Sequence, residues 1–193
     1  MGEDRSRARG GVLGKAEILK RIRLDVESPS YLGVVPFSKR LVQTASLDVR
    51  LGHRFGVPPR SSLAFVGVGD LCKSESGNWE RVFVPDDQEF VIHPGSIVVG
   101  TTLEFVSLPA DVLAFVEGKS SIGRMGLLVA TATQVAPGFH GVVVLELVNA
   151  GSVPVVVEPG QEIAQLVFFS LTAPVRKEDL YRSRHYCQVD PWG

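Results

Sequence analysis

The spacing of apolar residues changes once along this chain, near residue 24. Across residues 13–23 the apolar positions fall on one helical face, with Lys and Arg on the other, which predicts an amphipathic helix. Beyond it, short runs rich in Val, Leu, Ile and Phe are separated by Gly, Pro, Asp and Asn, a pattern typical of strands joined by tight turns. The predicted strands are 46–51, 62–66, 81–84, 90–92, 97–101, 103–107, 113–117, 127–130, 141–149, 153–157 and 162–170.

Many short strands with a single N-terminal helix predict an all-β fold, either an antiparallel sandwich, a jelly roll or a barrel. Residues 142–148 are apolar on both strand faces apart from Glu146, so we expect a central strand there. We expect one β-domain over residues 12–172, preceded by a flexible tail at 1–11. The polar and basic stretch 173–193 predicts an arm that orders on a ligand.

Composition narrows the range of functions. The 193 residues are 45% apolar with a net charge of -1, which excludes disorder as the default state and gives no broad cationic surface for nucleic acid or a membrane. No apolar run reaches the roughly 18 to 20 residues that cross a bilayer, and residues 1–11 lack the apolar stretch of a signal peptide. We therefore expect a cytoplasmic protein.

The potential metal ligands are scattered. The two cysteines, Cys72 and Cys187, are far apart in the sequence, and the four histidines are isolated from one another. A zinc-dependent nucleobase deaminase needs a His or Cys followed later by a closely spaced Cys pair. That spacing is absent, so we expect no zinc site.

Three segments contain candidate chemistry. Residues 118–124 contain two hydroxyls and two cations between glycines, a combination that favours a polyphosphate site. An ordinary loop with a capping Ser is the alternative interpretation of the same residues. Glu146 lies on an apolar strand, where a desolvated carboxylate suits proton transfer and a structural ion pair is the alternative. Residues 131–139 combine small side chains with Phe139. This combination suits the binding of a flat ring or a sugar, and it equally suits a hairpin whose Phe lies in the core.

Several motifs in order resemble the dCTP deaminase family, relatives of the trimeric dUTPases. They lie at residues 43–52, 93–95, 108–111, 118–124, 137–139, 145–149 and 159–166. The resemblance covers about residues 12–188. It implies a distorted jelly roll that assembles as a homotrimer with active sites at the subunit interfaces. It also implies metal-independent deamination of dCTP to dUTP and ammonia, with Mg²⁺ bound only through the triphosphate and no zinc.

The resemblance implies roles for individual residues. Glu146 would be the general base that takes a proton from water and passes it to the ring and the departing ammonia. Ser120 and Arg124 would orient that water and the glutamate. The substrate-binding residues that the resemblance implies are Lys119, Ser121, Thr131, Ala132, Val135, Phe139, Gln165, Tyr186 and Gln188.

These substrate contacts divide by the part of the nucleotide they would hold. Lys119 and Ser121 would bind phosphates, and the backbone around Thr131 and Ala132 would hold the pyrimidine. Phe139 would pack on the deoxyribose and disfavour a 2′-hydroxyl.

The sequence departs from the family pattern in a few places. Ala136 stands where an Asp usually helps to hold the sugar, which predicts altered sugar specificity. Lys119 stands where Arg is usual, so charge is kept and bidentate geometry is lost. Residues 185–188 only loosely follow the closing segment, in which a terminal Gln matching Gln188 helps to close the arm.

Four functions stay open at this point. The leading one is a dCTP deaminase that releases dUTP. A bifunctional enzyme would continue to dUMP and pyrophosphate, a step that Ala136 disfavours because related dUTPases use an acidic residue in this turn. The others are a deaminase of a modified cytidine nucleotide and a non-catalytic pyrimidine-nucleotide-binding regulator. Glu146 argues against the regulator, because a binding module has no need of that carboxylate.

Overall fold

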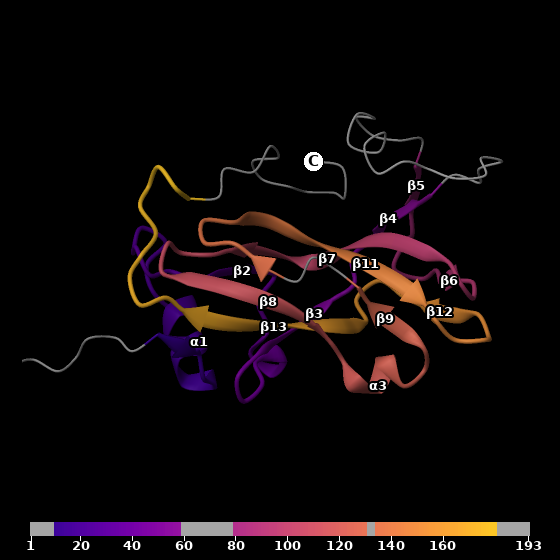
Figure 1. Ribbon diagram of the computed structural model, residues 1–193, viewed down its shortest axis with the longest axis horizontal. Helices are drawn as coiled ribbons and strands as arrows, with labels where there is room; N and C mark the ends of the chain where they lie inside the picture. The colour runs from indigo at the N-terminus through magenta and orange to yellow at the C-terminus, as the bar shows by residue number, and fades with distance from the viewer. Residues whose placement is uncertain (1–9, 59–78, 131–133, 181–193) are drawn as a thin grey trace, which may run out of the picture.

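The computed structural model describes residues 10–58, 79–130 and 134–180, which form a mainly β fold (Figure 1). The strands in this part of the chain pair antiparallel. The elements are β1 (Gly11–Val12), α1 (Lys15–Ile22), β2 (Gly33–Val35), the 3₁₀ turn η1 (Lys39–Leu41), β3 (Leu47–Arg50), β4 (Arg54–Val57), β5 (Glu80–Phe83), β6 (Phe90–Ile92), β7 (Ile97–Ser107), β8 (Val112–Gly118), α3 (Ser120–Gly123), β9 (Leu127–Val129), β10 (Gln134–Val135), β11 (His140–Asn149), β12 (Val155–Val157) and β13 (Glu162–Ser170).

Two larger sheets make up the body of the described chain. One has the order β1-β13-β8-β10, with β3 also pairing with β13. The other has the order β5-β4-β7-β11-β9, with β2 also pairing with β7. A small sheet joins β12 to β6. This is the predicted all-β, distorted jelly-roll architecture, and β11 lies between two partner strands as expected for its apolar sequence.

The hydrophobic core lies between the two larger sheets. On β11, Leu145 and Leu147 are fully buried, and on β13 so are Leu166 and Phe168. All four belong to one buried cluster. Because successive side chains of a strand point to opposite faces, Glu146 lies on the outer face of its sheet.

The predicted N-terminal helix is present and shorter than expected. Its apolar face buries Ile18 completely, while most of its charged residues face outward. Leu13 lies before the helix in extended backbone, where its N–H donates to the carbonyl of Phe168. Arg21 is the exception on the charged face, since it is buried at 9% exposure. No helix in the described ranges is long and apolar enough to cross a membrane.

The strand predictions were wrong in two respects. The strands expected at 97–101 and 103–107 are one strand, β7, and the interruption is a β-bulge at which the Thr102 hydroxyl accepts the Val143 N–H at 2.9 Å. The short strands β1, β2, β4 and β10 were not predicted, because their pairing depends on neighbours distant in sequence. Residues 118–124, where an ordinary loop was the alternative to a polyphosphate site, include the single helical turn α3.

Some predicted elements lie outside the described residues. These are the strand at 62–66, residues 1–9 of the tail and residues 181–193 of the arm.

Candidate active site

Lys119, the predicted phosphate-binding cation, is held by two carboxylates of its own chain. Its Nζ donates to Oδ2 of Asp48 and to Oε2 of Glu162, both at 2.8 Å. Asp48 lies on β3 and Glu162 at the start of β13, two strands that pair with each other. The Asp48 side chain is buried and those of Lys119 and Glu162 are partly shielded from water, so the contacts form a partly buried ion-pair cluster.

The cluster extends to a second predicted site residue, Gln165. Glu162 also accepts from Arg40 at 2.6 Å, and Asp48 accepts from the Gln43 amide at 3.0 Å. Gln165 lies opposite Asp48 in the β3–β13 pairing and accepts the Ser46 hydroxyl at 2.8 Å. The structure therefore brings Lys119 and Gln165 to the same end of one sheet.

Charge pairing shifts the ionisation of this cluster. The hydrogen bond from Lys119 lowers the pKa of the Glu162 carboxyl below its ordinary 4.5; burial opposes the shift, and the hydrogen bond from Arg40 reinforces it. Burial lowers the pKa of the Lys119 ammonium, but the hydrogen bonds to Asp48 and Glu162 outweigh it, so the pKa is raised above 10.5. Both groups are therefore charged at neutral pH.

Replacing Glu162 with Gln is expected to cost stability at neutral pH and little at low pH. A carboxyl with a lowered folded pKa stabilises the fold above its unfolded pKa, and this contribution is lost as pH falls through the folded pKa. The gap in urea midpoint between wild type and Glu162→Gln should therefore close as the pH falls below the ordinary value of 4.5. Glu158→Gln is the control, because Glu158 is exposed and its carboxylate forms no ion pair in the described part of the chain. A gap that is independent of pH would contradict the role of Lys119.

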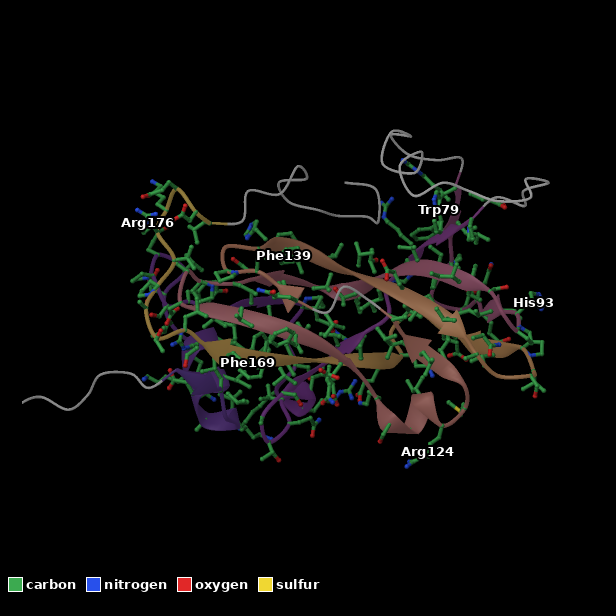
Figure 2. All side chains as sticks on the ribbon, viewed as in Figure 1. Trp79, His93, Arg124, Phe139, Phe169 and Arg176 are labelled. Atoms are coloured by element: carbon green, nitrogen blue, oxygen red, sulfur yellow. The ribbon has the colours of Figure 1, made fainter. Side chains whose placement is uncertain are left out.

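The α3 turn presents its polar side chains to solvent. Ser120, Ser121 and Arg124 are exposed, while Ile122 is buried and fixes the turn to the core. The N–H groups of Ile122, Gly123 and Arg124 bond back to the carbonyls of Lys119 and Ser120. Arg124 lies at the lower edge of the molecule in Figure 2, beyond α3.

Glu146 lies on a different sheet from the Lys119 cluster and has apolar neighbours. It is half-buried on the outer face of β11, level with Val99 of β7 and flanked along its own strand by Val144 and Val148. No hydrogen bond or ion pair of its carboxylate occurs within the described residues. The structural ion pair considered from sequence is therefore not formed with Arg124 in this chain.

The end of β9 reaches Glu146 from the other side. The Ala130 N–H donates to the carbonyl of Glu146 at 2.8 Å. Residues 131–133, which include the predicted pyrimidine-holding Thr131 and Ala132, follow at once and lie outside the described residues. Pairing of β9 with β11 therefore places Ala130, the last residue before that segment, beside Glu146.

Residues 136–139 form the turn predicted to hold the sugar, which we call the sugar turn. Its aromatic residue, Phe139, is buried in the core. Phe139 is 8% exposed and belongs to the core cluster, and Val135 of β10 is 6% exposed. Ala136 is partly exposed. Packing of Phe139 on a deoxyribose stays a prediction, as does the contribution of Tyr186 and Gln188, which lie outside the described residues.

The partners of Lys119 were not predicted from the sequence. Asp48 and Glu162 lie in motifs that resemble the family, but neither was given a role. The available signal was the charged residue between Leu47 and Val49 in an otherwise apolar strand, since a buried carboxylate needs a partner. No group of three or more potential metal ligands occurs in the residues that the structure describes.

Comparison with known proteins identifies the family. A family model described as dCTP deaminase-like matches residues 12–171. The chain belongs to the dCTP deaminase-like family. The "dCTP deaminase, dUMP-forming" of Leifsonia xyli subsp. xyli is 41% identical over 164 residues, covering 83% of this chain and 80% of that protein. The "dCTP deaminase" of Halorubrum lacusprofundi is 38% identical over 168 residues, covering 86% of this chain and 80% of that protein.

A solved structure has the same fold. The 2'-deoxycytidine 5'-triphosphate deaminase of Agrobacterium tumefaciens superposes with a TM-score of 0.61 at 24% identity. The match covers 83% of this chain and 48% of the solved one, so this chain spans about half the length of that protein. The likeness confirms the fold class predicted from the sequence.

Proposed function

We propose that this protein is a dCTP deaminase that hydrolyses the C4 amino group of the cytosine ring, with Glu146 as the general base. The observation that carries the proposal is the position of Glu146. Its carboxylate is half-buried among valines, is free of a salt bridge in the described chain, and lies beside the end of β9. Partial desolvation favours proton exchange, and a well-placed general base contributes about 10² to 10⁴-fold to rate.

The reaction needs one water and releases one ammonia. Glu146 takes a proton from water as the oxygen attacks C4, then gives that proton to ring N3. The second proton of the former water moves to the amino nitrogen, and ammonia leaves as the C4 carbonyl forms. Ser120 and Arg124 would orient the water and the glutamate, as the family motif implies. The products are dUTP and ammonia.

The triphosphate would bind at the α3 end of β8. The exposed hydroxyls of Ser120 and Ser121 and the Arg124 guanidinium supply donors and positive charge. Lys119 would join them if its ammonium is shared between phosphate and the two carboxylates that hold it. Mg²⁺ would arrive bound to the triphosphate as part of the substrate. Because that substrate is a nucleoside triphosphate, we expect the enzyme to act in the cytoplasm.

In this proposal a second protomer would complete the site. Glu146 and the α3 side chains form no hydrogen bond or ion pair with each other in the described chain. The outer face around Glu146 is also apolar: Ile97 and Leu128, which pair on either side of Val148, are 40% and 45% exposed. Another copy of the chain would cover these exposed apolar residues and bring its own α3 toward Glu146. We therefore propose a homotrimer with interface active sites.

A second candidate function is the bifunctional reaction that ends at dUMP and pyrophosphate. Several relatives, including the Leifsonia protein, are named dUMP-forming. Ala136 is the opposing observation, because it leaves the sugar turn without the acidic residue that would organise a second water.

A panel of nucleotides tests the proposal and separates the two candidates. The purified protein is incubated with Mg²⁺ and dCTP, CTP or dCMP, and the products are resolved by chromatography. We expect conversion of dCTP, little conversion of CTP because of the packing around Phe139, and none of dCMP, which lacks the outer phosphates. Accumulation of dUTP supports the single reaction, and dUMP with pyrophosphate supports the bifunctional one. Conversion of none of the three would contradict both.

A further inference from the structure

A partly buried ion pair joins helix α1 to the turn between β7 and β8. The Arg21 guanidinium donates from Nη1 to Oδ1 of Asp111 at 3.0 Å and from Nη2 to Oδ2 at 2.8 Å. The two parallel hydrogen bonds fix both the distance and the plane of the pair. The Arg21 side chain is 11% exposed and that of Asp111 is 20% exposed, so solvent screens the pair weakly.

The same turn holds the root of the C-terminal arm, residues 171–180. The N–H of Leu171 donates to the Asp111 carbonyl at 2.8 Å, and the N–H of Val175 donates to the Ala110 carbonyl at 2.9 Å. In Figure 1 this segment leaves the end of β13 and rises along the edge of the domain toward the turn between β10 and β11. The arm therefore takes its direction from the β7–β8 turn.

The turn also holds the predicted sugar-binding segment. The N–H of Leu108 donates to the Phe139 carbonyl at 2.9 Å, and the N–H of Gly138 donates to the Leu108 carbonyl at 3.1 Å. Gly138 has a φ of +82°, and a Cβ there would lie 3.2 Å from Leu180 at the end of the arm root. The absence of a side chain at Gly138 lets Leu180 pack directly on the sugar turn.

We infer that Arg21 and Asp111 are positioning residues for nucleotide binding, because their ion pair fixes a turn that holds both the arm root and the sugar turn. The inference rests on the proposed function and adds a role that neither residue has in the reaction itself. Loss of Arg21 leaves Asp111 without its counterion, and loss of Asp111 leaves Arg21 paired with Glu17 alone. Either change frees the turn to shift. The arm root would then leave the domain in a different direction, and the position of the sugar turn relative to the arm root would change.

The variants Asp111→Asn and Arg21→Gln test this role, with Glu17→Gln as the matched control. Glu17 bonds the Nε of Arg21 on the exposed side of the helix and does not contact the turn. In folded Asp111→Asn and Arg21→Gln we expect the KM for dCTP to rise on the order of tenfold, since small misplacements of binding groups have effects of this size. A residue that acts only through stability would lower the yield of folded enzyme and leave KM unchanged.

Trypsin cleavage after Arg176 and Lys177 in nucleotide-free protein gives a readout that does not depend on turnover. We expect faster cleavage there in both variants than in wild type and Glu17→Gln. Should neither variant fold, Arg21→Lys keeps the charge without the paired N–H geometry and should show the same two changes. Unchanged KM and cleavage, or equal changes in Glu17→Gln, would overturn the inference. If wild type fails to convert dCTP, the proposed function fails while the cleavage test still decides the positioning of the arm.

Discussion

Glu146→Gln is expected to stop ammonia release from dCTP while nucleotide binding is retained. Glutamine has nearly the shape of glutamate, so the apolar surroundings of Val99, Val144 and Val148 are preserved. An amide cannot accept the proton of the attacking water, and loss of a general base costs about 10² to 10⁴-fold in rate. Steady-state ammonia release gives kcat, and equilibrium dialysis with dCTP gives the dissociation constant.

The control for this variant is Glu158→Gln, which changes the same side chain in an exposed turn. It should leave both constants within the error of wild type. A Glu146→Gln enzyme with near-normal kcat would contradict the assignment of the base. Loss of binding together with rate would instead indicate that the carboxylate holds the nucleotide rather than moving its proton.

Chains that carry Glu146→Gln and chains that carry Arg124→Ala are expected to restore activity when they assemble together, although each alone is inactive. The proposed site takes Glu146 from one protomer and α3 from another. Random mixing at equal amounts gives both an intact Glu146 and an intact Arg124 to about a quarter of all sites, and to about a third of the sites in trimers that contain both kinds of chain. Co-expression with two affinity tags isolates the mixed trimers, and their ammonia release is compared with wild type.

The experiment needs two controls and has two outcomes that would contradict the proposal. Co-expressed wild-type chains that carry the same two tags control for any effect of tagging, and sedimentation verifies that the mixed species are trimers. Absence of activity in verified mixed trimers would place Glu146 and Arg124 in the same chain's site. A stable monomer in the wild type would contradict the interface site altogether.

The strands that form the core could be predicted from the sequence because their burial is local in pattern. In β13 the alternate residues Ala164, Leu166 and Phe168 are apolar and buried, and the predicted bounds 162–170 match the observed ones. In β11 the run around Glu146 indicated a central strand for the same reason. Strand β4, which lies between β5 and β7, was missed because His53 and Arg54 dilute the apolar pattern and its pairing with β7 involves residues far along the chain.

The candidate site could be predicted in part. The residue types at Ser120, Arg124 and Glu146 favoured deamination once the motifs were placed in order. The partners of Lys119 could not be predicted, because Asp48 and Glu162 come from strands separated by more than a hundred residues. Nor could the absence of an ion pair between Glu146 and Arg124 within the described chain, since local spacing does not fix where the α3 turn lies relative to β11.

Ammonia release from dCTP by the wild-type protein tests the central claim most directly. The protein is supplied with dCTP and Mg²⁺, and ammonia is measured against total uracil nucleotide formed. The deaminase proposal predicts one ammonia for each dCTP consumed, with uracil nucleotide in equal amount. Tight binding of dCTP without any ammonia would contradict it and would leave a pyrimidine-nucleotide-binding protein that does no chemistry.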